Sequence, residues 1–474
     1  NSIMGSFSFS SIIDSSLSET FNWHEKLFCL ERLTPPWENI EIVDRNYIDT
    51  NNLINGGSLS LIHNVFPFIK LKWKIKHSNY IKDEIFRDYM VKGPLKKWTH
   101  DHIFQNDNNQ TKVIDKISFN THIFEDILDK WIEKQLESTF EYRHKILKHD
   151  LCSINLKNQN KEFYILITGG NGLIGKHLIP MLNSFGYKII QLKYNKKIKN
   201  YKSINIEFND FIKIEWNPYL NEDLELPKEI SDKIKYVINL SGENILGIPT
   251  KKKKELIMES RKISTNRLLK IIKKNKINLQ CCIHASATGF YGNDLNNEII
   301  ESSTKGDGFL SDTTKIWEDF QNKFNSISNR VVNLRIGAVL SRKGGFLKSM
   351  TMPYKMSLGI KIKSDNFISH ISIEDLCRSI CYILKEENLN GPINAVCPQP
   401  EKLSNIFNIL RRKYTSNINI NINKRFIEKI SPELNNELLF SNQYIIPKKL
   451  LDNGFQFLNN NFNDSINSMY PKGG

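Results

Sequence analysis

The stretch ILITGGNGLIG, residues 165–175, holds the residue types and spacing in this chain that point most directly to chemistry. Gly169, Gly172 and Gly175 follow a G-x-x-G-x-x-G spacing between an apolar run and an amphipathic segment. The pattern predicts a strand, a turn and a helix that together hold a pyrophosphate, with a purely structural turn as the alternative. We assign the tight turn to Gly169, the close approach to the pyrophosphate to Gly172, and the packing of the helix on the sheet to Gly175. The predicted contact residues are Thr168, Gly169, Gly170, Asn171, Gly172, Leu173 and Ile174.

The end of the next apolar run indicates which dinucleotide would bind. A site for NAD usually places an acidic residue about 20 positions after the glycines, where it accepts from the ribose 2′-hydroxyl. Here the stretch QLKYNKKIK, residues 191–199, contains Lys193, Lys196 and Lys197, and the next acidic residue is Glu207. Because cationic side chains attract a 2′-phosphate, we predict NADP(H) in preference to NAD(H), with Lys193 as a contact. The alternative is that these lysines belong to a solvated loop.

A parallel sheet is needed to bring these groups together. After residue 162 the apolar runs FYILIT, KIIQL, YVINLSG, CCIHASA and VVNLRIGAVL alternate with helical segments, one of them expected from about Lys252 to Lys274. Strands separated by helices are typical of an α/β fold with a doubly wound parallel sheet. The tract SNINININK, residues 416–424, alternates with period two and predicts a further strand.

The first third of the chain has a different pattern. Residues 1–119 contain short alternating or aromatic-rich runs separated by turn signals such as INGG and QNDNNQ, which predict an antiparallel sheet. Residues 15–33 start with a capping box, Ser16 to Glu19, and predict a helix, as does the apolar spacing over residues 122–151. We expect an α+β domain over residues 1–151, in which one long helix closes a curved sheet. The polar stretch at residues 152–162 is the predicted linker.

Length and composition limit the number of domains, the kinds of site and the cellular compartments that we expect. A chain of 474 residues predicts two or three domains. Its seven cysteines show no C-x-x-C and no Cys/His spacing suited to zinc, so we predict no disulfide framework and no metal site. A reducing compartment follows, cytoplasmic or organellar (plastid or mitochondrion), and we expect no secretion and no membrane span. The chain begins with Asn rather than Met, which fits the removal of a leader.

The formal net charge of +15 raises the question of nucleic-acid binding. The basic excess lies after residue 160, and its densest run is TKKKKELIMESRK, residues 250–262. Apolar spacing downstream favours the first turns of a solvated helix over a localisation signal or a phosphate-binding patch. We predict no nucleic-acid partner and expect the charge to attract a polyanionic nucleotide.

Several stretches after residue 162 resemble the epimerase-family proteins of the atypical, extended short-chain dehydrogenase/reductases, some of which are labelled cell-division inhibitor-like. The resemblance covers residues 163–470. It rests on NLSGENI (239–245), ESRKISTNRLL (259–269), HASATGFYG (284–292), LRIGAVLSRKGGFLKSM (334–350), GPINAVCPQP (391–400) and IPKKLLDNGFQF (446–457). It implies a Rossmann domain over residues 163–398 and a small C-terminal substrate lobe over residues 399–474.

The resemblance also implies site residues. At the cofactor it places Asn239, Leu240, Ser241, Gly242 and Ala285. Ser286 and Thr288 would offer a hydroxyl to the reacting carbonyl and Tyr291 would line the substrate pocket, whereas packing roles are the alternative for these three. Arg261 would shape the substrate site, or else form an ion pair at the surface.

The Tyr-x-x-x-Lys pair that normally serves hydride transfer in this superfamily is absent. In the stretch FLSDTTKIWEDF, residues 309–320, Leu310 stands at the Tyr position and Thr314 at the Lys position. Lys315 is one residue late, about 100° around the helix. The family lacks the pair here as well, so a proton relay would fall to Tyr291 with Ser286 or Thr288.

A second departure from the family pattern lies in HISIEDL, residues 370–376. His370 stands at a Trp position and Ser372 at a His position. We interpret Glu374 and Asp375 as an N-terminal charge pair of a helix, and we consider His370 as an alternative proton donor.

The first domain resembles the START/Bet v 1-like superfamily of polyketide cyclases and lipid carriers. The resemblance covers nearly all of residues 5–151 and rests on LTPPWE (33–38), GPLKKWTHDHIF (93–104) and FEYRHKILKHDL (140–151). It implies a helix-grip fold around an apolar cavity for a hydrophobic ligand. The alternative is that aromatic residues such as Trp73, Trp98 and Trp131 fill the core.

These features leave two classes of function. The first is an NADP(H)-dependent oxidoreductase or epimerase that acts on a small carbonyl or hydroxyl compound of unknown identity, hydrophobic if the first domain presents it to the nicotinamide. The second is a non-catalytic NADP(H)-sensing regulator or hydrophobic-ligand carrier, for example in organelle division.

Overall fold

The computed structural model shows two compact units. The first comprises Asn1–Lys161, Pro180–Tyr187 and Met469–Gly474, and the second comprises Glu162–Ile179 and Lys188–Ser468. The structure describes residues 5–46, 56–66, 69–121, 125–153, 162–201, 205–208, 210–242, 251–293, 297–414, 418–422 and 442–471. Most of the predicted linker, residues 154–161, lies outside this set. Among the described residues, the structure contains no helix with the length and apolar character of a membrane span.

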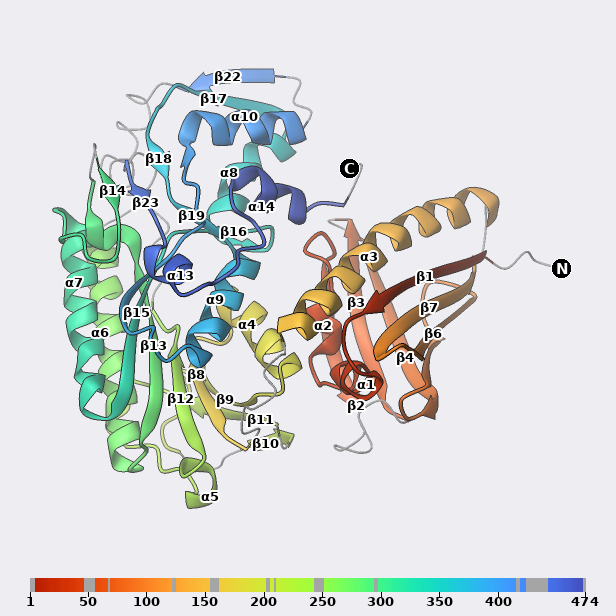
Figure 1. Ribbon diagram of the computed structural model, residues 1–474, viewed down its shortest axis with the longest axis horizontal. Helices are drawn as coiled ribbons and strands as arrows, with labels where there is room; N and C mark the ends of the chain where they lie inside the picture. The colour runs from red at the N-terminus through yellow and green to blue at the C-terminus, as the bar shows by residue number, and fades with distance from the viewer. Residues whose placement is uncertain are drawn as a thin grey trace. The chain divides into compact units, whose positions relative to one another are not determined.

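A seven-stranded antiparallel sheet forms the first unit, in the order β1-β7-β6-β5-β4-β3-β2. Its strands are β1 (Gly5–Ile13), β2 (Ile40–Asn46), β3 (Ser58–Phe66), β4 (Ile69–Ile81), β5 (Ile85–Lys92), β6 (Lys97–Asp107) and β7 (Gln110–Asn120). Its helices are α1 (Leu17–His24), α2 (Cys29–Leu33) and α3 (Glu125–Ser153). Figure 1 shows α3 lying across one face of this sheet. The antiparallel sheet and the long helix are therefore confirmed.

Apolar alternation explains the core of this unit. Val113, Ile117 and Phe119 point from β7 to the buried face, where Ile117 and Phe119 meet Phe140 of α3. The edge-to-face pair of Trp73 and Trp98 also lies in this sheet. Trp131 is half exposed, at 50%, so the alternative in which it fills the core is wrong for this residue. It lies on the outer side of α3.

The capping box near the N-terminus is confirmed. Ser16 Oγ accepts from Glu19 N at 3.3 Å and donates to the Glu19 carboxylate at 2.9 Å. The helix that was predicted over residues 15–33 is, however, two helices, because α1 ends at His24 and α2 begins at Cys29.

An eight-stranded sheet organises the second unit, in the order β10-β11-β9-β8-β12-β13-β15-β20. The strands are β8 (Tyr164–Thr168), β9 (Lys188–Tyr194), β10 (Asn205–Phe208), β11 (Phe211–Trp216), β12 (Ile234–Asn239), β13 (Leu279–Ala287), β15 (Ser328–Ile336) and β20 (Gly391–Ala395). All neighbouring pairs are parallel except β10 with β11. The predicted α/β fold with a parallel sheet is confirmed.

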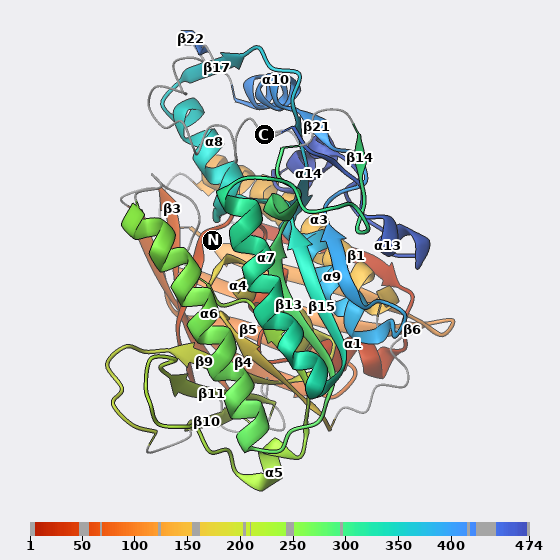
Figure 2. The ribbon, with the colours of Figure 1, turned by 90° about the vertical axis from the view of Figure 1, so that its left-hand side faces the viewer.

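Helices cover both faces of this sheet. Figures 1 and 2 show α6 (Lys251–Lys274) and α7 (Phe309–Gln321) on one face, and α9 (Ile373–Lys385) and the first turns of α4 (Leu173–Ser184) on the other. The helix predicted at the basic run is α6, while Thr250 lies outside the described residues. Fully buried strand residues such as Leu166, Val237 and Cys282 explain the continuous apolar runs in the sequence.

Short elements build a smaller lobe beside the sheet. Its strand pairs are β14 (Glu298–Ile299) with β23 (Tyr444–Ile445), β16 (Ala338–Ser341) with β19 (His370–Ser372), β17 (Leu358–Ile362) with β22 (Ile418–Ile422), and β18 (Phe367–Ile368) with β21 (Glu401–Lys402). Its helices are α8 (Gly345–Lys355), α10 (Leu403–Lys413), α13 (Lys448–Asp452) and α14 (Phe462–Ser468), while α5 (Lys228–Ser231) precedes β12. The lobe thus draws on segments before residue 399 as well as after it. Strand β22 confirms the strand predicted in SNINININK, of which residues 416, 417, 423 and 424 lie outside the described part.

Candidate active site

The order of the strands creates one position at which a ligand could sit across the sheet. The chain winds outward from β8 to β9 and β11 on one side, and from β12 to β13, β15 and β20 on the other. The connections that follow β8 and β12 therefore leave the carboxyl edge in opposite directions. Open α/β sheets bind their ligands at such a topological switch point.

The glycine-rich turn after β8 lies at this switch point. Gly169 has φ +71°, and a Cβ on it would lie 2.5 Å from the carbonyl oxygen of Leu240 after β12. A Cβ on Gly175 would lie 2.4 Å from the Cα of Gly170, because α4 packs directly against the turn. These two positions bring backbone segments closer together than any side chain permits.

Gly172 differs from these two glycines. Its N–H donates to the carbonyl of Gly169 at 2.9 Å, and a Cβ on it would meet only that same oxygen, at 3.2 Å, among the described atoms. Asn171 and Gly172 are exposed at the start of α4. Gln191 of β9 fixes the turn by donating to Asn171 Oδ1 at 3.0 Å. The turn therefore leaves open space next to the N-terminus of α4. The N-terminus of a helix attracts anions.

Asn239, the last residue of β12, fixes the opposite side of the crevice. Its Oδ1 accepts from Thr168 Oγ1 at 2.7 Å and from Ser241 Oγ at 2.6 Å, and its Nδ2 donates to His284 Nδ1 at 3.1 Å. Burial lowers the pKa of His284 to about 3, so the imidazole is neutral and can accept this hydrogen bond. Leu240 and Ser241 are half-buried and Gly242 is exposed, so they form the rim. Residues 243–245 of the NLSGENI stretch lie outside the described part.

Lys193 lies near the carboxyl end of β9, on the same edge as the glycine turn. Its Nζ is 3.9 Å from Glu215 Oε1 of β11, and both side chains are partly exposed, at 41% and 47%. Lys196 and Lys197 are exposed. No acidic residue follows the glycines closely in sequence, but the parallel pairing of β9 with β11 places Glu215 directly beside Lys193.

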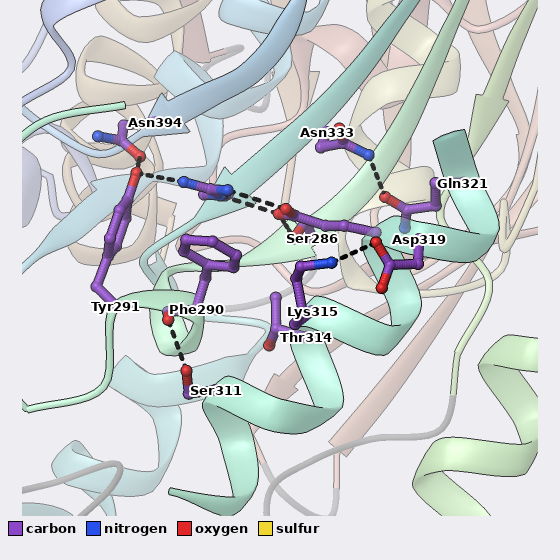
Figure 3. A network of polar contacts seen from close by, with 12 residues as sticks. Ser286, Phe290, Tyr291, Ser311, Thr314, Lys315, Asp319, Gln321, Asn333 and Asn394 are labelled. Carbon is purple, nitrogen blue, oxygen red and sulfur yellow. Dashed lines mark hydrogen bonds and ion pairs between the residues drawn. The ribbon is translucent and has the colours of Figure 1, made fainter. Parts of the chain in front are cut away.

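A buried polar network crosses the carboxyl ends of β13, β15 and β20 (Figure 3). Ser286 Oγ donates to Glu318 Oε1 at 2.7 Å. The guanidinium of Arg335 donates to both oxygens of Glu318 at 2.9 Å and to the hydroxyl of Tyr291 at 2.9 Å. Tyr291 in turn donates to Asn394 Oδ1 at 2.6 Å. Ser286, Arg335 and Asn394 are register partners on adjacent strands, which explains why they form one row.

Burial keeps the hydroxyl of Tyr291 protonated at neutral pH. Burial raises the pKa of Tyr291 to about 12, although the neighbouring Arg335 opposes the shift. The guanidinium of Arg335 also stacks 3.5 Å from the centre of the Phe290 ring, and only 4% of its side chain is exposed. A phenol with this pKa is protonated at neutral pH, and Tyr291 uses its one proton in the hydrogen bond to Asn394.

The three predicted catalytic hydroxyls are not in direct contact with one another. Ser286 reaches Tyr291 only through Glu318 and Arg335, and Thr288 Oγ1 lies 3.5 Å from the carbonyl oxygen of Ile336. All three side chains belong to buried residues.

The positions of the missing dyad face the turn after β13. Thr314 Oγ1 donates to the carbonyl of Leu310 at 2.7 Å. A Cβ on Gly289 would lie 3.2 Å from Leu310 Cβ and 3.7 Å from Thr314 Oγ1. Lys315 instead forms an exposed ion pair with Asp319 at 2.5 Å, so it points away from this turn (Figure 3).

Two further predicted site residues are buried. Arg261 is only 6% exposed and its guanidinium stacks 4.6 Å above the ring of Trp317, so the surface alternative for it is wrong. Ala285 is buried, and its carbonyl accepts from Gln321 Nε2 at 2.8 Å. Arg261, on α6, thus packs against α7, and its side chain lies next to Gly242.

The HISIEDL stretch has a structural role. Ser372 caps α9, accepting from Asp375 N at 3.0 Å and donating to the Asp375 carboxylate at 2.8 Å, so the interpretation of Glu374 and Asp375 as first-turn charges is confirmed. His370 is fully buried beside Cys397 Sγ, at 3.5 Å. Burial lowers its pKa to about 3. A group that holds no proton at neutral pH is a poor proton donor.

Relatives of known sequence place the chain in a family. The model described as the NAD dependent epimerase/dehydratase family matches residues 165–312. The epimerase family protein YfhF of Bacillus subtilis (strain 168) is 30% identical over 295 residues, which are 62% of this chain and 93% of YfhF. The chain belongs to the NAD-dependent epimerase/dehydratase family.

Solved structures share the fold of this epimerase-family chain. The nucleoside-diphosphate sugar epimerase from Corynebacterium glutamicum has a TM-score of 0.75 at 24% identity and covers 98% of this chain and 90% of its own. The human epimerase family protein SDR39U1 (isoform 2), solved with NADPH, has a TM-score of 0.54 at 23% identity, covering 65% of this chain and 99% of its own.

The C-terminal segment of the epimerase-family chain closes around the network. Gln443 Nε2 donates to the carbonyl of Thr288 at 3.2 Å, and Asn394 Nδ2 donates to the carbonyl of Ile446 at 3.1 Å. Farther along, Leu458 N donates to the buried carboxylate of Asp375 at 2.8 Å. Residues 443–459 therefore supply hydrogen-bond partners for buried groups of earlier elements.

Sequence reasoning missed Glu318, Arg335 and Asn394 as members of the site. Glu318 lies in the stretch of the absent dyad, and Arg335 and Asn394 lie within the family stretches, but none of the three was given a role. A charged residue near the carboxyl end of a buried strand, such as Arg335 in LRIG, is the signal that could have found them.

Proposed function

We propose that the second unit binds NADP(H) at its switch point and uses it as an oxidoreductase or epimerase on a small carbonyl or hydroxyl compound. One observation carries this proposal: the open space at Gly172, the start of α4 and the rim formed by Ser241 and Gly242 all lie on one edge of the sheet. Pyrophosphate would contact residues 168–174, and the nicotinamide would lie toward Asn239–Gly242 and Ala285. The solved complex of the human relative with NADPH supports the choice of cofactor.

Roles for the substrate side follow from the buried network. A bound nicotinamide would donate or accept a hydride. In this proposal Ser286 and Thr288 lie nearest to the reacting carbonyl and Tyr291 lines the pocket, with its hydroxyl oriented by Arg335 and Asn394. Arg261 shapes the substrate site from α6. Because the hydroxyl of Tyr291 donates its proton to Asn394 and accepts from Arg335, water would supply the proton that completes reduction of a carbonyl to an alcohol.

A second candidate function is an NADP(H) sensor without turnover. Leu310 and Thr314 stand where the proton-relay pair would be, and Tyr291 is held in its protonated form. In that case the cofactor site would be intact and the chemistry absent. The first unit, which we propose to be START/Bet v 1-like, would then carry a hydrophobic ligand rather than deliver a substrate.

Calorimetric titration with NADPH and NADH at matched ionic strength tests the cofactor proposal. We expect Lys193→Ala to weaken NADPH binding about 5-fold, because a charged hydrogen bond at a partly exposed site contributes about 1 kcal/mol, and to leave NADH binding unchanged. Lys188→Ala is the matched control, since Lys188 begins the same strand about 17 Å away and loses the same charge. Glu215→Gln should tighten NADPH binding about 1.5- to 5-fold by removing a competing carboxylate.

The outcome separates the alternatives. Equal effects of the two lysine variants would exclude a 2′-phosphate contact at Lys193. Tight NADPH binding without hydride loss to any of a panel of carbonyl compounds would favour the sensor. Binding of neither dinucleotide would refute the cofactor proposal.

A further inference from the structure

A row of ionisable side chains crosses the interior of the first unit, on the face of the sheet that otherwise buries apolar residues. On β7, Asp115 lies between Val113 and Ile117 on the buried side, and on β6 both His100 and His102 point to that side. The remaining members are His77 of β4, Asp88 of β5 and His144 of α3. The strands of the row are neighbours in the sheet, so alternation alone brings these groups together.

Three of these side chains converge as ligands of a cation would. One donor atom from each of Asp88, His100 and His102 lies within 4.8 Å of the other two. His102 Nε2 is 3.4 Å from Asp88 Oδ2, which is long for a charged hydrogen bond. Two ligands that share a tetrahedral metal at about 2.1 Å are separated by about 3.4 Å. The separation therefore suits joint coordination better than a direct bond.

The other members of the row hold these three in place. Asp115 Oδ1 lies 2.7 Å from His100 Nε2 and 2.9 Å from His102 Nδ1. The opposite nitrogen of each ring, Nδ1 of His100 and Nε2 of His102, is thereby left to reach a cation. Metal-binding histidines almost always donate their second N–H to a carboxylate or carbonyl in this way.

A further layer orients the two carboxylates. His144 Nε2 is 2.6 Å from Asp115 Oδ2, and its Nδ1 is 2.6 Å from Ser11 Oγ. His77 Nδ1 is 2.5 Å from Asp88 Oδ1, so the other oxygen of Asp88 is the one that faces His102. This is the arrangement of an orienting shell around a compact set of ligands.

Both carboxylates of the row lie among ring nitrogens in the interior, where the side chains of Asp115 and Asp88 are 7% and 20% exposed. A divalent cation between His102 Nε2 and Asp88 Oδ2 would take the place of the proton that otherwise links these two atoms.

We propose that Asp88, His100 and His102 bind a divalent transition-metal ion, such as Zn²⁺ or Fe²⁺, inside the first unit. Two imidazoles and one carboxylate form a ligand set that both ions accept, and three protein ligands leave a position for water or for an oxygen atom of a bound compound. Asp115, His144 and His77 are positioning residues. The side chains of Asp88 and His77 are 20% and 12% exposed, so this end of the row reaches the surface. The site is independent of the cofactor site of the second unit.

Metal binding by the full chain tests this proposal. The purified protein is stripped with a chelator and equilibrated with Zn²⁺ or Co²⁺, and retained metal is measured by mass spectrometry after gel filtration. We expect about one ion per chain and ligand-field bands from Co²⁺. His102→Gln and Asp88→Asn should abolish retention, and Asp115→Asn should weaken binding about 10- to 100-fold.

His63→Gln is the matched control. His63 lies on β3, three strands from β6, about 14 Å at the usual strand spacing, and its replacement should leave binding unchanged. Far-UV circular dichroism and a cooperative thermal melt show whether each variant is folded. A folded wild-type protein that retains neither ion would overturn the proposal, as would retention equal to wild type in both His102→Gln and Asp88→Asn.

Discussion

The Gly172→Ala substitution tests whether the glycine-rich turn binds a ligand or serves only the fold. The backbone of Gly172 does not have a positive φ, and an added Cβ would meet only the carbonyl oxygen of Gly169, at 3.2 Å. A pyrophosphate seated on the start of α4 would, in contrast, lie where that methyl group points. We therefore expect Gly172→Ala to weaken NADPH binding while leaving stability almost unchanged.

The magnitudes follow from these contacts. Alanine at a compatible glycine position stabilises a protein by about 0.4–1 kcal/mol, and the 3.2 Å contact offsets part of this gain, so the melting temperature should move by no more than about 3 °C. A methyl group forced against a tightly seated ligand costs about 1–3 kcal/mol. The dissociation constant for NADPH should therefore rise about 5- to 150-fold.

Gly169→Ala is the informative comparison. It combines φ +71° with a Cβ only 2.5 Å from the Leu240 carbonyl oxygen, so both stability and binding should fall. We expect a loss of roughly 3 kcal/mol of stability. Calorimetry with NADPH and thermal melts of both variants measure the two quantities. An unchanged NADPH affinity in a folded Gly172→Ala protein would refute the cradle.

Two further predictions concern buried groups of the second unit. Glu318→Gln should destabilise the protein by about 3 kcal/mol, because it leaves the guanidinium of Arg335 buried without its charge partner; urea unfolding measures the loss, and the Glu318→Leu/Arg335→Met double variant should lose less than the single one. His284 and His370 have pKa values of about 3 in the folded state, so they stabilise it fully above about pH 6.5, and this stability is lost as the pH falls from there toward 3. His370→Gln should make the melting temperature less dependent on pH between 6.5 and 4, and an unchanged pH dependence would contradict its neutral burial.

Local patterns predicted much of the second unit. The predicted apolar runs form buried strands. The predicted glycine spacing coincides with a turn in which Gly169 has a positive φ. The predicted helix from about Lys252 is α6, which begins at Lys251. These features are decided by neighbours in sequence, which is why sequence alone sufficed for them.

Contacts between distant residues could not be predicted in the same way. Glu318 and Arg335 pair across 17 positions, and Lys193 meets Glu215 only because β9 and β11 are adjacent. The burial of Arg261 depends on its contact with the ring of Trp317, which belongs to another helix. Such partners appear only after the order of the strands is known.

The first unit shows the same division. The alternation of its strands predicted the sheet, but the stretch GPLKKWTHDHIF was used only for a family resemblance, and its histidines were not considered. Its H-x-H spacing, which places two histidines on one face of a strand, is a signal for a polar cluster. Only Cys/His spacings of structural zinc sites had been considered, and the carboxylates come from two other strands.

The partners supplied by residues 443–459 bear on how the protein folds during synthesis. Until that segment leaves the ribosome, Asp375 and Asn394 lack the groups that satisfy them in the native structure. The sheet itself can assemble earlier, because its last strand ends at Ala395. At about 5–20 residues per second, these two polar side chains would wait several seconds for their native partners.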